Sequence, residues 1–153
     1  MGLIRTILMG LGAIFLLILA GVFYLFNTTD NFKDENAAFV EQFLYKYSER
    51  WETSDVRDML SKEFLSSLNT GDSRRAITNF KSLGKLRKIS DIEMTSYNAM
   101  NSETTGTFAL KAEFENSTTA VTVSVRKDEQ GLRILSLNIN AIQQTPMNRA
   151  VPI

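Results

Sequence analysis

The chain has no cysteine and no histidine among its 153 residues. The absence of cysteine excludes disulfide bonds, thiolate nucleophiles and thiolate metal sites. The absence of histidine removes the side chain that proteins use most often as a general base and as a transition-metal ligand. Catalysis would have to depend on Asp, Glu, Tyr, Lys or Ser alone. We therefore expect no cofactor and no metal, and we favour a protein that is not an enzyme, although composition leaves that question open.

An excess of charge of one sign is also missing, because 17 Lys and Arg residues balance 17 Asp and Glu residues. Arg5 is the only charged residue among the first 29. No global field therefore directs the protein toward nucleic acid, and we expect no nucleic-acid partner. Proline is scarce too, and both prolines, Pro146 and Pro152, lie close to the end of the sequence. This position predicts an irregular C-terminal tail over residues 143–153.

The run from Ile7 to Phe26 contains no charged and no strongly polar side chain. As a helix it would be about 30 Å long, which is the thickness of the hydrocarbon core of a bilayer. A cleaved signal peptide and a buried helix are the alternatives. The apolar part of a signal peptide is usually shorter, whereas here the apolar run continues beyond Ala20 and Gly21. The pattern predicts a transmembrane anchor and short linker over residues 1–29, with residues 7–26 in the lipid bilayer.

The charges that flank this run predict its orientation. Arg5 and the α-amino group precede it, whereas Asp30, Asp34 and Glu35 follow it together with Lys33. Because positive flanks stay in the cytoplasm, we expect the N-terminus inside and the rest of the chain outside. In a Gram-negative cell, this topology gives a single-pass protein of the inner (cytoplasmic) membrane with a periplasmic, extracytoplasmic domain.

After residue 29, apolar residues recur at helical spacing and predict three helices. The first covers residues 31–51 and follows Asp30, a plausible N-cap. The second begins at residues 53–55 and continues to about residue 68, and the third covers residues 72–83 with Gly84 as its C-cap.

Beyond Gly84 the apolar period changes to two, which is typical of strands with one buried face. The predicted strands are residues 89–97, 108–115, 120–127 and 132–140, and the turns after the second and third strands are rich in Asn, Asp, Ser and Gly. The sequence therefore predicts an α+β domain over residues 30–142, with three helices packed on a curved four-stranded antiparallel sheet. A curved sheet around a helix makes a cone with an interior cavity.

Three stretches carry a resemblance to a known family: the end of the first helix at residues 47–51 (YSERW), residues 80–86 (FKSLGKL), and the meander of residues 108–115, 120–127 and 132–140. The last strand, which begins with GLRIL at residues 131–135, adds to this resemblance. Together with the order of elements over residues 31–142, they resemble the nuclear transport factor 2-like, or cystatin-like, cone fold. The likeness includes small membrane-anchored bacterial domains of unknown function, in which an aromatic residue stands where this chain has Leu132. The tethered topology also resembles periplasmic subunits of type IV secretion machines. No residue matches the catalytic Asp and Tyr of the related ketosteroid isomerase, so no catalytic residue is carried over.

Two groups of residues are candidate sites. Aromatic side chains could line a small-molecule pocket inside the cone or could simply form its core; they are Trp51, Phe80, Tyr97, Phe108 and Phe114. A basic set, with no acid between Asp72 and Asp91, could bind an anionic partner. It consists of Arg74, Arg75, Lys81, Lys85, Arg87 and Lys88. The alternatives for the basic set are an ordinary solvated surface and pairing with the acidic helices of the same chain.

Two functions remain open from the sequence. We favour a non-catalytic, membrane-tethered accessory or interaction domain of the cell envelope, because the sequence combines an anchor, one small domain and no catalytic motif. Its partner would be another envelope protein or a second copy of the chain, bound through the sheet face or the basic set. The alternative is a small-molecule-binding or catalytic pocket inside a nuclear transport factor 2-like cone.

Overall fold

The structure is a computed structural model, and it describes residues 17, 18, 22 and 32–140. The chain divides into two compact units, Met1–Glu35 and Asn36–Ile153. In the first unit, every described residue is helical.

The predicted membrane anchor lies mostly outside the described residues. Only residues 17, 18 and 22 of the span 7–26 are described, so the anchor stays a prediction. Within the described part of the chain, no helix is long and apolar enough to cross a membrane. The predicted C-terminal tail, residues 143–153, also lies outside the described residues.

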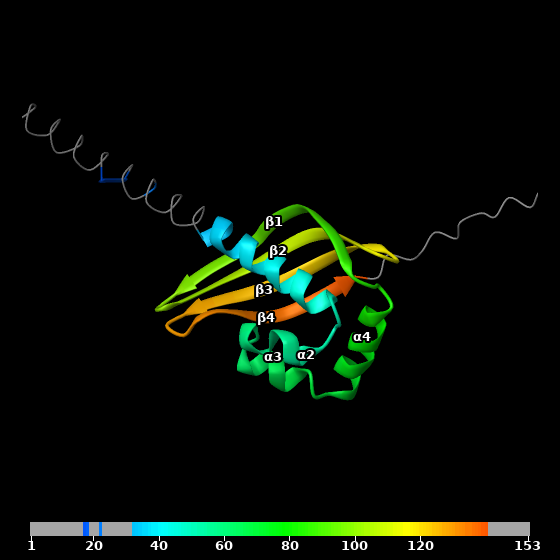
Figure 1. The fold of residues 1–153 in the computed structure, drawn as a ribbon. Coiled ribbons are helices and arrows are strands. Elements are labelled where there is room, and N and C mark those ends of the chain that lie inside the picture. Colours follow the sequence, from blue (N-terminus) through cyan, green and yellow to red (C-terminus); the bar gives the residue numbers. More distant parts are fainter. Residues whose placement is uncertain (1–16, 19–21, 23–31, 141–153) are drawn as a thin grey trace, which may run out of the picture. The chain divides into compact units, whose positions relative to one another are not determined.

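The second unit begins with a helix over residues 36–48, called the central helix below. Its apolar residues Val40, Phe43, Leu44 and Tyr47 lie three or four positions apart and are all buried. This spacing places them on one side of a helix with 3.6 residues per turn. The central helix uses that side to cross the sheet, as Figure 1 shows in cyan. The sequence predicted this helix and its buried stripe but extended it to residue 51, whereas the described helix ends at Ser48.

The second predicted helix is broken in the structure. Its residues form α2 (Thr53–Val56), the 3-10 turn η1 (Arg57–Met59) and α3 (Lys62–Ser67). Between η1 and α3 the backbone becomes extended at Leu60, which pairs with Ile134 of the sheet. The Ser61 N–H donates to the Ile134 carbonyl at 2.9 Å, and the Ser61 hydroxyl caps α3. The sequence could not predict this break because it depends on an edge strand far along the chain.

The last helix, α4 (Gly71–Lys81), agrees closely with the prediction. Thr70 caps its N-terminus by accepting a hydrogen bond from the Ser73 N–H. After the helix, Gly84 adopts a φ of +77°, and a Cβ atom there would lie 2.7 Å from Oε2 of Glu115. Glycine is needed at this position both for the left-handed backbone and for the close approach of the β2–β3 turn.

Four antiparallel strands follow in the order β1-β2-β3-β4, which confirms the predicted α+β class and the meander. They are β1 (Leu86–Met100), β2 (Glu103–Phe114), β3 (Thr118–Asp128) and β4 (Gly131–Asn140). β1 is longer than predicted and contains three register shifts, one of them beside Asp91 at a φ of +53°. Such bulges bend an edge strand and make it a poor template for a further strand.

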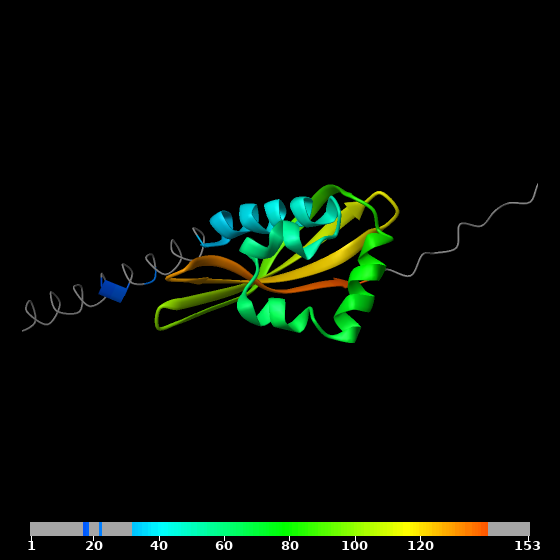
Figure 2. The same ribbon diagram turned by 60° about the horizontal axis from the view of Figure 1, so that its bottom comes forward.

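The core lies between the central helix and one face of the sheet. Phe108 of β2, Val123 of β3 and Ile134 of β4 have no exposed surface and face the fully buried Phe43 side of the helix. α3 and α4, by contrast, contain no fully buried residue. In Figure 2, α4 lies beside the end of β4. The unit therefore has a dense layer under the central helix and a looser layer under α3 and α4.

Candidate functional site

The C-terminal end of the central helix is held by Trp51. Its backbone has a φ of +55°, and its N–H donates to the Tyr47 carbonyl at 2.7 Å. The indole Nε1–H donates to the carbonyl of Gly84 at 3.1 Å. The ring also lies 5.7 Å from Phe80 and 5.7 Å from Phe114, centroid to centroid. Trp51 therefore joins the central helix, α4 and β2 in one aromatic cluster.

The five predicted pocket aromatics are only partly brought together. Trp51, Phe80 and Phe114 form the cluster just described. Phe108 is fully buried farther along β2, opposite Met94, and Tyr97 lies on β1 opposite Gly106. These rings fill the interior rather than surround a large space.

A small cavity does exist beside this cluster, between the central helix, α3, α4 and β4. Its volume is about 80 Å³. The hydroxyl-bearing Tyr47 and Ser73 contribute to its wall. The apolar part of the wall consists of Phe64, Leu68, Ala76, Ile77, Phe80 and Leu137. We call this space the α3–α4 cavity.

The α3–α4 cavity is too small for an ordinary ligand, because pockets for small molecules measure about 300–1,000 Å³. Its titratable group is Tyr47, whose pKa is raised by burial, while a hydrogen bond with Thr53 opposes the rise. The phenol therefore stays protonated at neutral pH and cannot act there as a general base. Phe80 is the predicted pocket residue that lines this cavity.

A second hollow, of about 400 Å³, lies at the turn between β1 and β2. Glu103 is the ionisable residue in its wall, and Met100 is 64% exposed there. Short polar side chains form the rest of the wall, and the hollow is a surface depression at a hairpin tip. It offers no pair of groups for acid–base chemistry.

The basic set does not form one uniform positive surface. Lys81 pairs with Glu52 at 2.9 Å, and Lys85 pairs with Glu49 at 2.8 Å. The neighbouring Glu49 carboxylate raises the pKa of the Lys85 ammonium. These pairs join the α4–β1 region to the residues that follow the central helix, so these charges meet the acids of the same chain.

The remaining members of the basic set differ in their surroundings. Arg87 lies 4.0 Å from Glu115. Arg74, Arg75 and Lys88 are exposed, and the structure shows no ion pair for them within its described residues. All six basic residues are exposed, and three of them pair with acids of the same chain, whereas the other three show no ion pair among the described residues. A group of three side chains able to hold a metal ion is absent from residues 32–140.

The outer face of the sheet, opposite the core, carries an uncharged row that the sequence did not reveal. Ser96, Thr107, Ser124 and Ser136 are direct cross-strand neighbours on the four strands. The hydroxyls of Thr107 and Ser124 lie 3.1 Å apart. We call these four residues the hydroxyl row. The alternation of polar residues predicted the outer positions, but their alignment depends on strand register.

The next row on the outer face is also built mainly from small side chains. Ala109 of β2 pairs with Thr122 of β3, and Thr122 pairs with Asn138 of β4. Charges lie at the margins of this area, with Glu93 on β1 and Lys111 on β2. The centre of the outer face is therefore uncharged and built from short side chains, and its hydroxyl and amide groups can bind a polar surface.

Comparisons with known proteins give one structural likeness. No protein-family model matches the chain, and a search of curated proteins finds no match. Among solved structures, the chain is similar to a designed nuclear transport factor 2-like protein titled Rd1NTF2_05 with five substitutions. The TM-score is 0.42 at 13% sequence identity, and the match covers 70% of this chain and 98% of that one.

Proposed function

We propose that the chain is a non-catalytic interaction domain of the cell envelope that binds a protein partner through the outer face of its sheet. The observation that carries this proposal is the hydroxyl row with its neighbouring small side chains. A surface of short side chains lets another backbone approach closely, and its hydroxyls supply both donors and acceptors. The partner is an envelope protein or a second copy of the chain.

The interior supports the same proposal. Phe43, Phe108 and Val123 fill the space between the central helix and the sheet and have no exposed surface. The space that remains, the α3–α4 cavity, is about 80 Å³. A binding or catalytic pocket inside the cone would need several times this volume. Three of the six basic residues already pair with acids of the same chain, so less of their charge is left for an anionic partner. The outer face is therefore the better candidate surface.

The membrane location is part of the proposal and depends on the sequence. The uncharged run over residues 7–26 supports a single-pass anchor, and Arg5 before it supports a cytoplasmic N-terminus. The domain would then lie outside the inner membrane. A single cysteine in place of Asn148 would test this, because the native chain has no cysteine. A membrane-impermeant maleimide should label it in intact cells, and protection until lysis would contradict the orientation.

The outer-face interaction can be tested by site-specific photo-crosslinking of the full-length chain in its membranes. A photoreactive residue in place of Thr122 should give a protein adduct, whereas the same residue in place of the exposed Thr78 of α4 should not. The substitutions Ser124→Arg and Ser136→Arg should abolish the adduct, because two guanidinium groups would prevent close approach.

The alternative surfaces give different outcomes in this experiment. Replacement of all six basic residues by Ser should leave the Thr122 adduct in place. Loss of the adduct in that variant, together with its retention in the two arginine variants, would assign the interaction to the basic set and overturn the outer-face proposal. An adduct at twice the mass of the chain would identify the partner as a second copy.

A further inference from the structure

We infer that α3, α4 and the turn between them form one hinged flap, residues 62–81, which opens as a rigid body and exposes the α3–α4 cavity. The inference is independent of the proposed outer-face interaction, because the cavity lies on the core side of the sheet. Its starting point is an uneven hold along this segment. Specific hydrogen bonds fix both of its ends to the sheet, whereas its middle is held mainly by half-buried apolar side chains.

The first end of the flap is fixed to the edge strand β4. Leu60 has extended backbone and bridges Ile134, and the N–H of the next residue, Ser61, donates to the Ile134 carbonyl at 2.9 Å. Leu60 and Ser61 are both buried, so water does not compete for this pairing. Glu63 adds an ion pair with Arg126 at 3.2 Å. This end therefore stays on the sheet when the rest of the flap moves.

The second end of the flap is fixed to the β2–β3 turn. The Asn116 N–H donates to the Leu83 carbonyl at 3.0 Å, and the Asn116 side-chain amide donates to the Ser82 carbonyl at 3.0 Å. Gly84 follows with a φ of +77°, and its carbonyl accepts a hydrogen bond from the indole of Trp51. Two other segments of the chain thus hold this end, so its motion is limited to rotation.

The two helices of the flap are joined to each other by hydroxyl groups. Thr70 caps α4, and its hydroxyl donates to the Ser67 carbonyl at 3.1 Å. The Ser73 hydroxyl donates to the same carbonyl at 2.7 Å. These bonds connect the first turn of α4 to the last residue of α3 and fix the angle between the helices. α3 and α4 therefore move as one body rather than as two independent helices.

The middle of the flap, residues 64–80, has a weaker hold on the rest of the unit. Within the described residues, the hydrogen bonds of its side chains all end inside the flap, and no ion pair leaves it. Phe64, Leu68 and Ile77 are only half-buried and border the α3–α4 cavity of about 80 Å³. Side chains beside an empty space lose the dispersion contacts that a filled interior gives. The closed position is therefore only weakly favoured over an open one.

A segment with two fixed ends and a stiff middle can rotate about the line that joins its ends. Hinge motions use a few residues at the ends of elements, and Leu60 and Gly84 lie at such positions. Rotation separates Phe64 and Ile77 from Leu137 of β4 without breaking the hydrogen bonds inside either helix. The open state, with a population of about 0.1–10%, gives the domain a transient apolar surface on the core side of its sheet.

The absence of cysteine allows the opening to be measured by thiol labelling of the full-length chain with the aromatic disulfide DTNB. Three single variants are compared: Ala76→Cys in the cavity wall, Thr78→Cys on the exposed side of α4, and Val123→Cys in the fully buried core. Ala76→Cys should react at least about tenfold more slowly than Thr78→Cys, because it waits for opening. It should react at least about 100-fold faster than Val123→Cys, which waits for global unfolding.

Two outcomes of the labelling experiment would overturn the inference. A rate equal to that of Thr78→Cys would mean that the cavity stands open permanently. A rate equal to that of Val123→Cys would mean that the flap moves only when the whole unit unfolds.

Amide hydrogen exchange of the full-length chain separates hinge motion from local unfolding, and it needs no substitution in the core. A rigid flap keeps its helical hydrogen bonds when it opens. The equilibrium constant for opening obtained from the α4 amides should therefore be at least about tenfold smaller than the one obtained from labelling of Ala76→Cys. Equal constants would mean that α4 unfolds whenever the cavity is exposed, and this result would overturn the inference of a rigid flap.

Discussion

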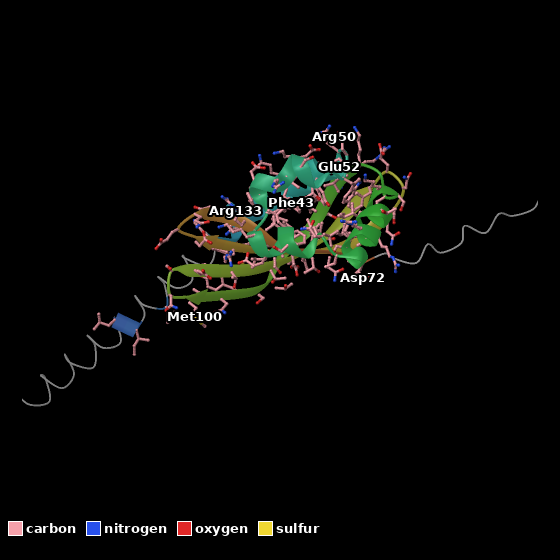
Figure 3. All side chains as sticks on the ribbon, turned by 90° about the horizontal axis from the view of Figure 1, so that it is seen from below. Phe43, Arg50, Glu52, Asp72, Met100 and Arg133 are labelled. Carbon is pink, nitrogen blue, oxygen red and sulfur yellow. The ribbon has the colours of Figure 1, made fainter. Side chains whose placement is uncertain are left out.

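The two layers of the interior differ in how completely they exclude solvent. Under the central helix, Phe43 and Phe108 have no exposed surface. Under α3 and α4, no residue of either helix is fully buried. Figure 3 shows Phe43 among the crowded side chains at the centre of the unit. Because apolar burial dominates folding free energy, the first layer should carry most of the stability, and the second should be the part that opens.

The largest expected effect comes from replacing a phenylalanine by alanine in each of the two layers. Phe43→Ala should lower the free energy of unfolding by about 3–5 kcal/mol, because it creates a cavity in a fully packed site. Phe64→Ala in α3 should lower the free energy of unfolding by about 1–2 kcal/mol. The loss is smaller because Phe64 is only half-buried, so less apolar surface is removed from water when the protein folds. Chemical denaturation of both variants measures the difference.

The control for this pair is a milder change at the same positions. Phe43→Leu and Phe64→Leu keep most of the apolar volume and should preserve the order at smaller magnitude. Equal losses for Phe43→Ala and Phe64→Ala would show that α3 belongs to the same cooperative core, and the distinction between the layers would have to be abandoned.

The second prediction concerns Gly84, where the two layers join. Gly84→Ala should lower the free energy of unfolding by about 2–3 kcal/mol, because the backbone is left-handed and the new Cβ would collide with Glu115. Gly131 provides a matched control, since its φ is +105° but the nearest atom to a Cβ would be Nη1 of Arg133 at 3.8 Å. Gly131→Ala should therefore cost less, through backbone strain alone.

Thermal unfolding of both variants measures this difference. If Gly131→Ala proves as costly as Gly84→Ala, then backbone strain alone accounts for both, and the close packing of the β2–β3 turn against Gly84 contributes nothing. If Gly84→Ala lowers the free energy of unfolding more than Gly131→Ala does, the connection between α4 and β1 is tightly packed at Gly84, although α4 itself is loosely packed.

The sequence predicted the features that follow from local patterns and missed those that depend on contacts between distant segments. The stripe through Phe43 and the alternation through Phe108 are local patterns, so the central helix and the strands followed from spacing alone. The break at Leu60 depends on pairing with Ile134, and the alignment of Ser124 with Ser136 depends on an extra residue in β4. Such contacts join distant segments, and no local period encodes them.

The candidate site was less predictable than the fold for the same reason. Phe80 could be identified as an interior aromatic from its helical position, but a cavity is a local failure of packing that composition does not reveal. The pairing of Lys81 with Glu52 and of Lys85 with Glu49 also follows from tertiary structure. The sequence indicated this pairing only as one of several alternatives.

The smallest expected effect concerns Glu63, which fastens α3 of the looser layer to β3. Its pKa is lowered by its own backbone N–H, then by the Ser61 hydroxyl and by Arg126, whose guanidinium lies 3.2 Å away. A lowered pKa in the folded state means that the contribution to stability is present above the unfolded pKa, about 4.3, and is lost as pH falls through the folded pKa.

Glu63→Gln should therefore lower the melting temperature slightly at neutral pH, by less than Gly84→Ala does. The gap between wild type and variant should shrink below about pH 4 and vanish once the carboxyl is protonated in both states. Ser61→Ala as the background should reduce the gap, because it removes one of the hydrogen bonds that lower the pKa. A gap that persists at pH 2.5 would assign the effect to packing of the side chain rather than to its charge. In that case, packing of α3 rather than the ion pair between Glu63 and Arg126 would hold this helix against the sheet.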